Sequence, residues 1–376
     1  MKFADIPGLA ETKSRLVNSV KDGKVAHAQL FIGRSGALNL PMALAYMTYL
    51  HCTNRGKDDA CGTCAACSKN LKYIHPDTHF VFPVSNVKGD KDDERFRADI
   101  MKAWRTFLLE HPFGNLVDWT LSYGGEDKQA IISREESREI VKSLSLKPFE
   151  SPFKVMIIWQ PEFMHPSAAN GILKIVEEPP PNTFFLLVSN NPERLLPTIL
   201  SRTQQVVVPM LSDKDLETYL ESQPGIDPKK INKVTAEAEG NIRLAQELLS
   251  SEIEDSHERM ALWMRTCFRK DYAAMVPLAD EFHEFDRLQQ QSFLAYTLMM
   301  MRETLLAMSG ATDMLRSRDG EQKFVQDFSK VMTVARIEKT NQLITDATLH
   351  LERNGSAKMI FLDLSLQVSK VLNMGS

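Results

Sequence analysis

Four of the five cysteines in this 376-residue chain lie close together, with a spacing typical of a metal site. Cys52, Cys61, Cys64 and Cys67 follow the pattern C-x8-C-x2-C-x2-C, with small residues between the last three. Zinc binds four soft ligands in a tetrahedron, and a Cys-x-x-Cys turn presents two thiolates to one ion. The alternative is a set of free or structural thiols. We expect a closed, structural Zn²⁺ site, because clustered thiols in a cytosolic chain favour metal over disulfides.

A second segment lies in the setting of a phosphate-binding loop but lacks its chemistry. Residues 33–40 follow an apolar strand and open a helical pattern, as the motif G-x-x-x-x-G-K-[ST] does. Gly33 is the first glycine of that motif, and Gly36 is a further glycine of the loop. At the last three positions stand Leu38 for glycine, Asn39 for the phosphate-binding lysine and Leu40 for the hydroxyl that holds Mg²⁺. An unrelated turn is the alternative, and in either case we expect no nucleotide bound by this chain itself.

The acidic residues of an ATPase are missing as well. A working site places Asp-Glu after the apolar run Val155–Ile158, to hold Mg²⁺ and the attacking water. Here Trp159 and Gln160 occupy those positions, and Glu162 comes two residues later. The sequence therefore predicts a degenerate ATPase site.

Alternating strand and helix patterns must position these residues. Helical spacing follows the first strand candidate, and a helix over Ser167–Glu178 ends at three prolines. Alternation of this kind indicates an α/β fold with a doubly wound parallel sheet. The strand candidates are Ala28–Ile32, His79–Phe82, Gln129–Ile132, Lys154–Trp159, Phe184–Val188 and Gln205–Val208.

The chain is expected to form three domains. Residues 1–208 form the α/β domain, with the zinc module at about 51–70 and an insertion at about 85–128 to which no role is assigned. Residues 209–252 form a small helical lid that opens with Ser212 as a helix cap. Residues 257–376 are helical, and their longest pattern, Phe285–Ser309, ends at Gly310. Met299–Met301 and Cys267 are expected in the helical core.

Composition limits the classes of function. The formal net charge is −4 and the pI about 6.2, whereas a protein that grips DNA alone shows a basic surplus. No apolar run is long enough for a transmembrane helix, and the first residues do not resemble a secretion signal. We therefore expect a cytosolic protein that does not bind membranes.

Several motifs, taken in order, resemble one family, the delta-prime subunits of the bacterial DNA polymerase III clamp loader, which have an AAA+ fold. Residues 1–250 carry this resemblance. The residues that follow agree with the family's oligomerising collar only in being helical. The family's Ser-Arg-Cys is Ser201-Arg202-Thr203 here, and the 85–128 insertion is longer than expected. The matching segments are Phe3–Gly8, His27–Gly33, the zinc spacing, His75–Asp77, Ala168–Pro179, Leu196–Arg202 and Gly240–Ala245.

The resemblance implies what this chain does. In the family, ATP is held by sister subunits, and Arg202 matches the arginine finger that one subunit lends to the γ-phosphate of its neighbour. Arg243 then becomes a structural lid residue. The implied partners are gamma/tau-type ATPase subunits and a delta subunit, and through that complex the sliding clamp and primer-template DNA. No catalysis by the chain alone is expected. The alternatives are an active gamma/tau-type AAA+ ATPase and a stand-alone zinc-dependent DNA-binding protein.

Overall fold

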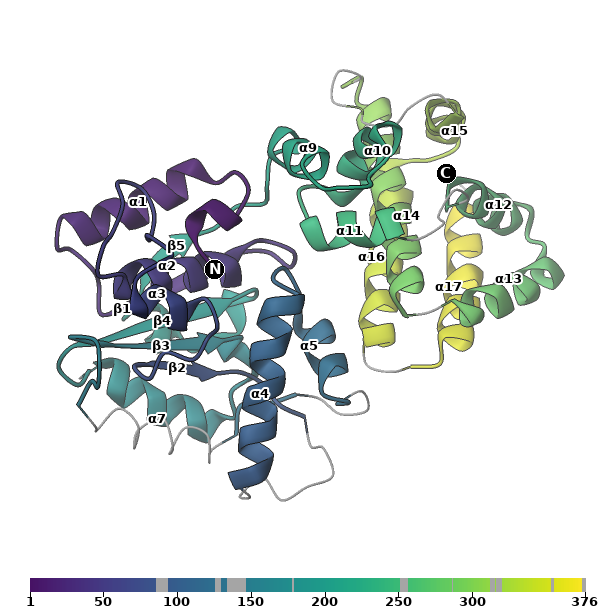
Figure 1. Cartoon of the computed structure of the whole chain (residues 1–376). Coiled ribbons are helices and arrows are strands. Elements are labelled where there is room, and N and C mark those ends of the chain that lie inside the picture. The colour runs from purple at the N-terminus through teal and green to yellow at the C-terminus, as the bar shows by residue number, and fades with distance from the viewer. Residues whose placement is uncertain are drawn as a thin grey trace. The chain divides into compact units, whose positions relative to one another are not determined.

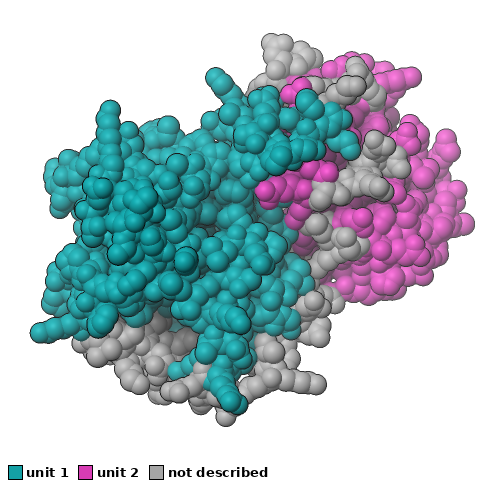
Figure 2. Space-filling model, in the orientation of Figure 1, with its two compact units in different colours: residues 1–231, 239–243 teal, residues 232–238, 244–376 magenta. Residues whose placement is uncertain are grey.

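The computed structural model describes residues 1–85, 94–125, 130–133, 147–177, 179–250, 256–285, 287–311, 315, 320–352 and 355–373. The chain divides into two compact units (Figure 2). The first comprises Met1–Ile231 with Glu239–Arg243, and the second Asn232–Ala238 with Leu244–Ser376. The boundaries of the three expected domains, 1–208, 209–252 and 257–376, stay a prediction.

A five-stranded sheet forms the centre of the first unit. All its strand pairs are parallel, in the order β2-β3-β4-β1-β5. Helices α1 and α2 lie on one face and α7 on the other (Figure 1), so the central strands are buried at nearly every residue. This confirms the expected α/β class with a doubly wound parallel sheet. The strands are β1 (Ala28–Ile32), β2 (Thr78–Val81), β3 (Lys154–Trp159), β4 (Thr183–Ser189) and β5 (Gln204–Val207).

The prediction of a strand at Gln129–Ile132 is wrong. Ile131 bridges Val84 in the antiparallel sense and Ile132 bridges Met164 in the parallel sense, both as isolated pairs outside the sheet. One residue paired on each side does not make a ladder, so the segment joins two loops instead of extending the sheet. Gln129 itself lies outside the described residues.

Helices of the first unit cover the sheet and carry the candidate site. Helix α2 is buried at every residue, which explains why its sequence is apolar all round. Helices α4 and α5 belong to the 85–128 insertion, of which residues 86–93 and 126–128 lie outside the described part. The elements are η1 (Phe3–Asp5), α1 (Ala10–Lys21), α2 (Asn39–His51), α3 (Ala65–Asn70), α4 (Glu94–Glu110), α5 (Leu116–Ser122), η2 (Pro161–Phe163), α7 (Pro166–Glu177), η3 (Pro192–Arg194) and α8 (Pro197–Leu200).

Only helices follow β5 in the described part of the chain. Ser212 caps α9 as expected, because its hydroxyl accepts the Asp215 N–H at 3.1 Å. None of the described helices has the length and apolarity to cross a bilayer. The helices are α9 (Asp213–Glu221), α10 (Pro228–Ala238), α11 (Ile242–Ser250), α12 (Ser256–Arg269), α13 (Tyr272–Glu284), α14 (Arg287–Met308), α15 (Gly320–Ser329), α16 (Val334–Glu352) and α17 (Ala357–Leu372).

The second unit has its own aromatic and methionine-rich core, in which α17 packs against α12, α13 and α16. Met299–Met301 are buried there, as expected. Cys267 is fully buried, and its burial raises the pKa of this thiol to about 12, so it is an inert core residue. Helix α14 ends where predicted: Gly310 adopts φ 75°, and its N–H donates to the Ala307 carbonyl.

Candidate functional site

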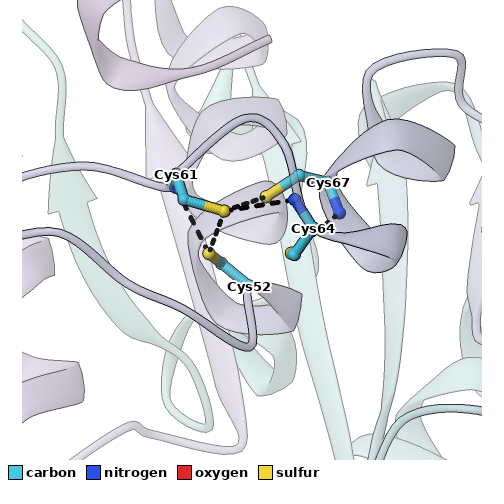
Figure 3. Close-up of side chains that lie close together, drawn as sticks. All are labelled: Cys52, Cys61, Cys64 and Cys67. Atoms are coloured by element: carbon cyan, nitrogen blue, oxygen red, sulfur yellow. Dashed lines mark hydrogen bonds between the residues drawn. The ribbon is translucent and has the colours of Figure 1, made fainter.

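The four clustered cysteines come from three consecutive segments: the end of α2, the loop after it and the start of α3. Cys52 caps the end of α2, Cys61 lies in the following loop, Cys64 caps the start of α3, and Cys67 lies in its first turn. Their sulfur atoms all lie within 4.8 Å of one another (Figure 3), with Cys52–Cys61 at 3.6 Å and Cys61–Cys67 at 3.9 Å. Sulfurs bound at 2.3 Å to a tetrahedral Zn²⁺ are about 3.8 Å apart. The four side chains therefore fit a single metal ion.

Hydrogen bonds around the cysteines favour the thiolate form that a metal needs. The backbone N–H of Cys64 donates to the Cys61 sulfur at 3.3 Å and lowers the pKa of that thiol. The pKa of Cys64 falls to about 5: burial opposes this, but hydrogen bonds from Thr53 and from the Cys67 N–H outweigh burial. Desolvation raises the pKa of Cys52 and of Cys67. A cation at the centre would supply the charge that keeps these two deprotonated.

Residues 33–40, where the sequence predicts a degenerate phosphate loop, are held by contacts within the chain. The side chain of Asn39, at the start of α2, is buried and donates to the Ser189 carbonyl at 3.0 Å and to the Asn190 side chain at 2.7 Å. Leu38 and Leu40, on either side of it, are buried as well. The amide that replaces the lysine thus holds the loop after β4 instead of facing outward.

Glycines of the same loop lie close to later parts of the chain. Gly36 has φ 89°, and a Cβ added there would lie 2.2 Å from the Asn241 side chain. A Cβ added at Gly33 would lie 3.2 Å from the Val208 carbonyl. The loop is therefore covered by the segment that precedes α11, within the same compact unit.

An aromatic cluster occupies the carboxyl end of β3, where an ATPase has its acidic pair. Trp159 is buried, with its ring 5.1 Å from that of Trp104 and 6.0 Å from that of Phe107. Trp119 completes the cluster, 5.0 Å from Trp104, and its ring N–H donates to the Pro83 carbonyl. Because three of these residues belong to α4 and α5, the insertion supplies the rings that cover this end of the strand.

The carboxylate of Glu162 binds backbone N–H groups of the loop after β4. Its Oε1 accepts the backbone N–H groups of Asn190 and Asn191, each at 3.0 Å, and burial raises the pKa of this carboxyl. Glu162 and Asn39 therefore hold the loop after β4 from two sides. The Asn190 side chain accepts the Asn39 amide N–H.

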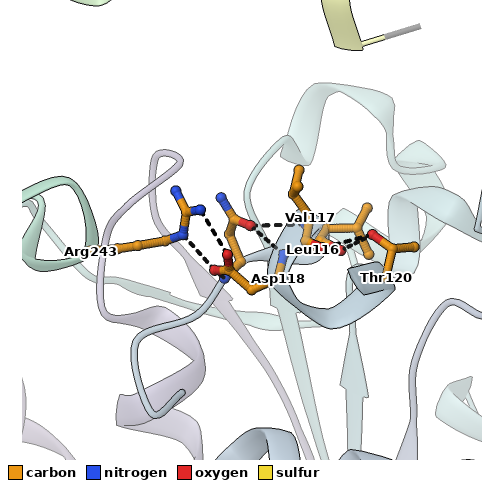
Figure 4. Close-up of polar contacts among 6 residues, drawn as sticks. Leu116, Val117, Asp118, Thr120 and Arg243 are labelled. Atoms are coloured by element: carbon orange, nitrogen blue, oxygen red, sulfur yellow. Dashed lines mark hydrogen bonds and ion pairs between the residues drawn. The ribbon is translucent and has the colours of Figure 1, made fainter. Parts of the chain in front are cut away.

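A residue of the insertion also contacts Arg243, and the sequence did not predict this contact. Asp118, in the first turn of α5, accepts Arg243 Nε at 2.5 Å and Nη2 at 2.7 Å (Figure 4). Both side chains are about one-fifth exposed, at 18% and 19%. Asp118 also accepts the Asn115 N–H, so the same carboxylate belongs to the capping box of α5 and binds Arg243.

Removing the carboxylate of Asp118 is expected to destabilise the first unit. Asp118→Ala leaves a partly buried guanidinium without its bidentate partner, which costs about 1–3 kcal/mol. A double-mutant cycle with Arg243→Ala, followed by urea unfolding, measures the coupling. Asp327→Ala, which removes the exposed partner of Lys330, is the control and should change nothing measurable. Additive losses in the cycle would show that the Asp118–Arg243 contact contributes no stability.

Arg202 follows α8 at the surface. Its Nε contacts Glu177 Oε1 at 2.8 Å, and its Nη1 donates to the Thr198 carbonyl and the Ser201 hydroxyl, both at 3.2 Å. The side chain is 40% exposed. Thr203, which replaces the family's cysteine, is buried and donates its hydroxyl to the Ile199 carbonyl. Arg202 thus projects from an anchored turn, with its charged group accessible.

The sheet and the helices that cover it define an α/β domain with a parallel sheet, followed by an α-helical region. The chain belongs to the family described as DNA polymerase III, delta subunit, which matches residues 8–212. This confirms the family that the motifs indicated.

Several relatives agree with that membership. The chain is 25% identical over 337 residues to DNA polymerase III subunit delta' of Bacillus subtilis, covering 89% of this chain and 86% of that protein. It is 26% identical over 259 residues to subunit delta' of Pseudomonas aeruginosa, covering 69% and 66% respectively. It is also 26% identical over 247 residues to subunit tau/gamma of Haemophilus influenzae, covering 64% of this chain but only 29% of that longer protein.

Proposed function

We propose that the chain is the clamp-loader subunit of DNA polymerase III that binds no ATP itself and acts on ATP held by a neighbour. It assembles with ATPase subunits of the gamma/tau type and with a delta subunit. The complex opens the sliding clamp and loads it onto primer-template DNA in the cytoplasm. In this complex Arg202 is the arginine finger supplied in trans. Family membership and the delta' relatives support the complex and its partners.

One contact carries the proposal that the chain's own site is inactive: the hydrogen bond from Asn39 to Asn190. A phosphate-binding lysine presents an ammonium to the β- and γ-phosphates. Asn39 has no charge, and its amide is already bound to Asn190 and to the Ser189 carbonyl. Leu40 offers no oxygen to Mg²⁺, and Trp159 is buried among rings instead of presenting a carboxylate. ATP·Mg²⁺ would gain almost no favourable contact here.

The isolated chain is therefore expected neither to bind ATP·Mg²⁺ tightly nor to hydrolyse it. Isothermal titration should show no binding in the micromolar range, with an isolated gamma/tau-type subunit as the positive control. Micromolar affinity would support the alternative, an active AAA+ ATPase subunit.

The remaining parts of the proposal concern the metal and assembly. Cys52, Cys61, Cys64 and Cys67 hold one Zn²⁺ with no open position, so the ion stabilises the fold and takes no part in hydrolysis. Residues 257–376 are proposed as the collar through which sister subunits bind. A stand-alone DNA-binding protein is disfavoured by the formal net charge of −4, since phosphate contacts need a basic surface.

A further inference from the structure

The guanidinium of Arg202 is held on one side by residues of its own chain. Glu177 contacts Nε at 2.8 Å, while the Thr198 carbonyl and the Ser201 hydroxyl accept from Nη1. Within the described part of the chain, Nη2 has no partner. A guanidinium has five N–H donors in a rigid plane, so fixing Nε and Nη1 also fixes the direction of Nη2.

Helix stability does not explain why a carboxylate stands at position 177. Glu177 is the last residue of α7, at the negative end of the helix dipole, where an acidic side chain is unfavourable. The ion pair is also exposed, with 40% and 41% of the two side chains accessible, and such pairs stabilise a fold little. The contact therefore matters for the position of Arg202 more than for folding.

We infer that Glu177 is a positioning residue for Arg202. It holds Nε so that Nη2 points outward, toward the γ-phosphate of ATP in the neighbouring subunit. This inference rests on the proposed role of Arg202 as a finger in trans. An arginine held in advance loses less side-chain freedom when it meets the phosphate, and donors fixed in advance are the ones that stabilise developing charge.

Two helices in contact with each other carry the residues of this arrangement. Helix α7 packs against α8, which carries the Thr198 carbonyl, and the buried Thr203 hydroxyl anchors the chain just after Arg202. Glu177 and the base of Arg202 are thus fixed to the same packed pair of helices. When the neighbouring subunit binds this surface, the guanidinium of Arg202 would therefore already be oriented.

The test is a reconstituted loader that contains this chain in full length, assayed for clamp- and DNA-stimulated ATP hydrolysis. Glu177→Ala should lower kcat about 3- to 10-fold, as expected for losing one charge-assisted contact, with KM for ATP unchanged. Glu177→Gln keeps an oxygen that accepts Nε–H and should recover part of the rate. In an Arg202→Ala background, Glu177→Ala should change nothing further, because it acts only through that arginine. Glu193→Ala removes another exposed carboxylate of the same unit and should behave as wild type.

The outcomes separate this inference from the proposed function. If Arg202→Ala slows hydrolysis but Glu177→Ala does not, Glu177 is no positioning residue, while the role of Arg202 as an arginine finger is still supported. A faster Glu177→Ala loader would mean that the carboxylate competes with phosphate, which also overturns the inference. A further loss in the Arg202→Ala background would indicate a structural role instead. If Arg202→Ala leaves hydrolysis and clamp loading unchanged, the finger and the inference fail together.

Discussion

Replacing Arg202 with alanine is expected to slow ATP hydrolysis about 10³-fold at the one site of an assembled clamp loader that this residue faces. The guanidinium stays charged at any working pH and can offer two donors to phosphate oxygens as charge develops on the transferred group. Arg202 contacts Glu177, Thr198 and Ser201 in its own chain, and none of the loop residues around Asn39. Its effect should therefore appear only in the complex.

The measurement compares hydrolysis and clamp loading by loaders that contain the wild-type or the Arg202→Ala chain. Total hydrolysis should fall only in part where other sites keep their own arginines, and clamp loading should fall further. Folding, zinc content and assembly should be unchanged, because the side chain is exposed. Arg194→Ala, at another exposed arginine of the same unit, is the matched control. Equal rates for Arg202→Ala and wild type in both assays would reduce this chain to a scaffold.

Loss of the metal is expected to have the largest effect on folding. Structural Zn²⁺ binding contributes about 10–16 kcal/mol in zinc-finger peptides, and four thiolates here would form a complete shell. The purified protein should contain about one Zn²⁺ per chain. Replacing Cys64 with serine, or adding a strong chelator, should unfold residues 51–70. Asp59 in this module accepts the Phe3 and Ala4 N–H groups at 3.0 and 2.8 Å, so protection of these two amides should be lost as well.

Elemental analysis and amide hydrogen exchange test this prediction together. Cys267→Ala is the control, since this cysteine lies in the helical core of the other unit and should keep the zinc content at the wild-type value. Protein purified under reducing conditions without chelator and found to carry no metal would refute the zinc assignment.

Sequence patterns predicted the parts of the fold that depend on local physics. Lys154–Trp159 is a buried parallel strand because both faces are covered, and its apolar run shows this directly. Ser212 and Gly310 mark helix ends because a side-chain acceptor and a positive φ are local requirements. The cysteine cluster could be predicted for the same reason, since ligands close in sequence are held close in space.

Contacts between distant segments could not be predicted from one sequence. Asp118 and Arg243 are 125 residues apart, and nothing in either segment indicates the other. The bond from Asn39 to Asn190 likewise joins the start of α2 to the loop after β4, 151 residues later. Ile131 and Ile132 have the composition of a strand, but their partners Val84 and Met164 lie in loops, so only isolated bridges form. The sequence indicated no role for the insertion, because its aromatic residues cover the end of β3 only in the folded chain, where they pack against Trp159.

The cluster around Trp159 also has an evolutionary consequence. Asn39→Lys alone would not restore an ATPase, because β3 would still end in an indole packed against Trp104 and Phe107. Trp159→Asp would place a carboxylate among buried rings and leave a cavity, at a cost of several kcal/mol. Neither substitution alone would therefore yield an active site. Under the proposed function, the aromatic rings of the insertion therefore oppose the gain of ATP hydrolysis by a single substitution.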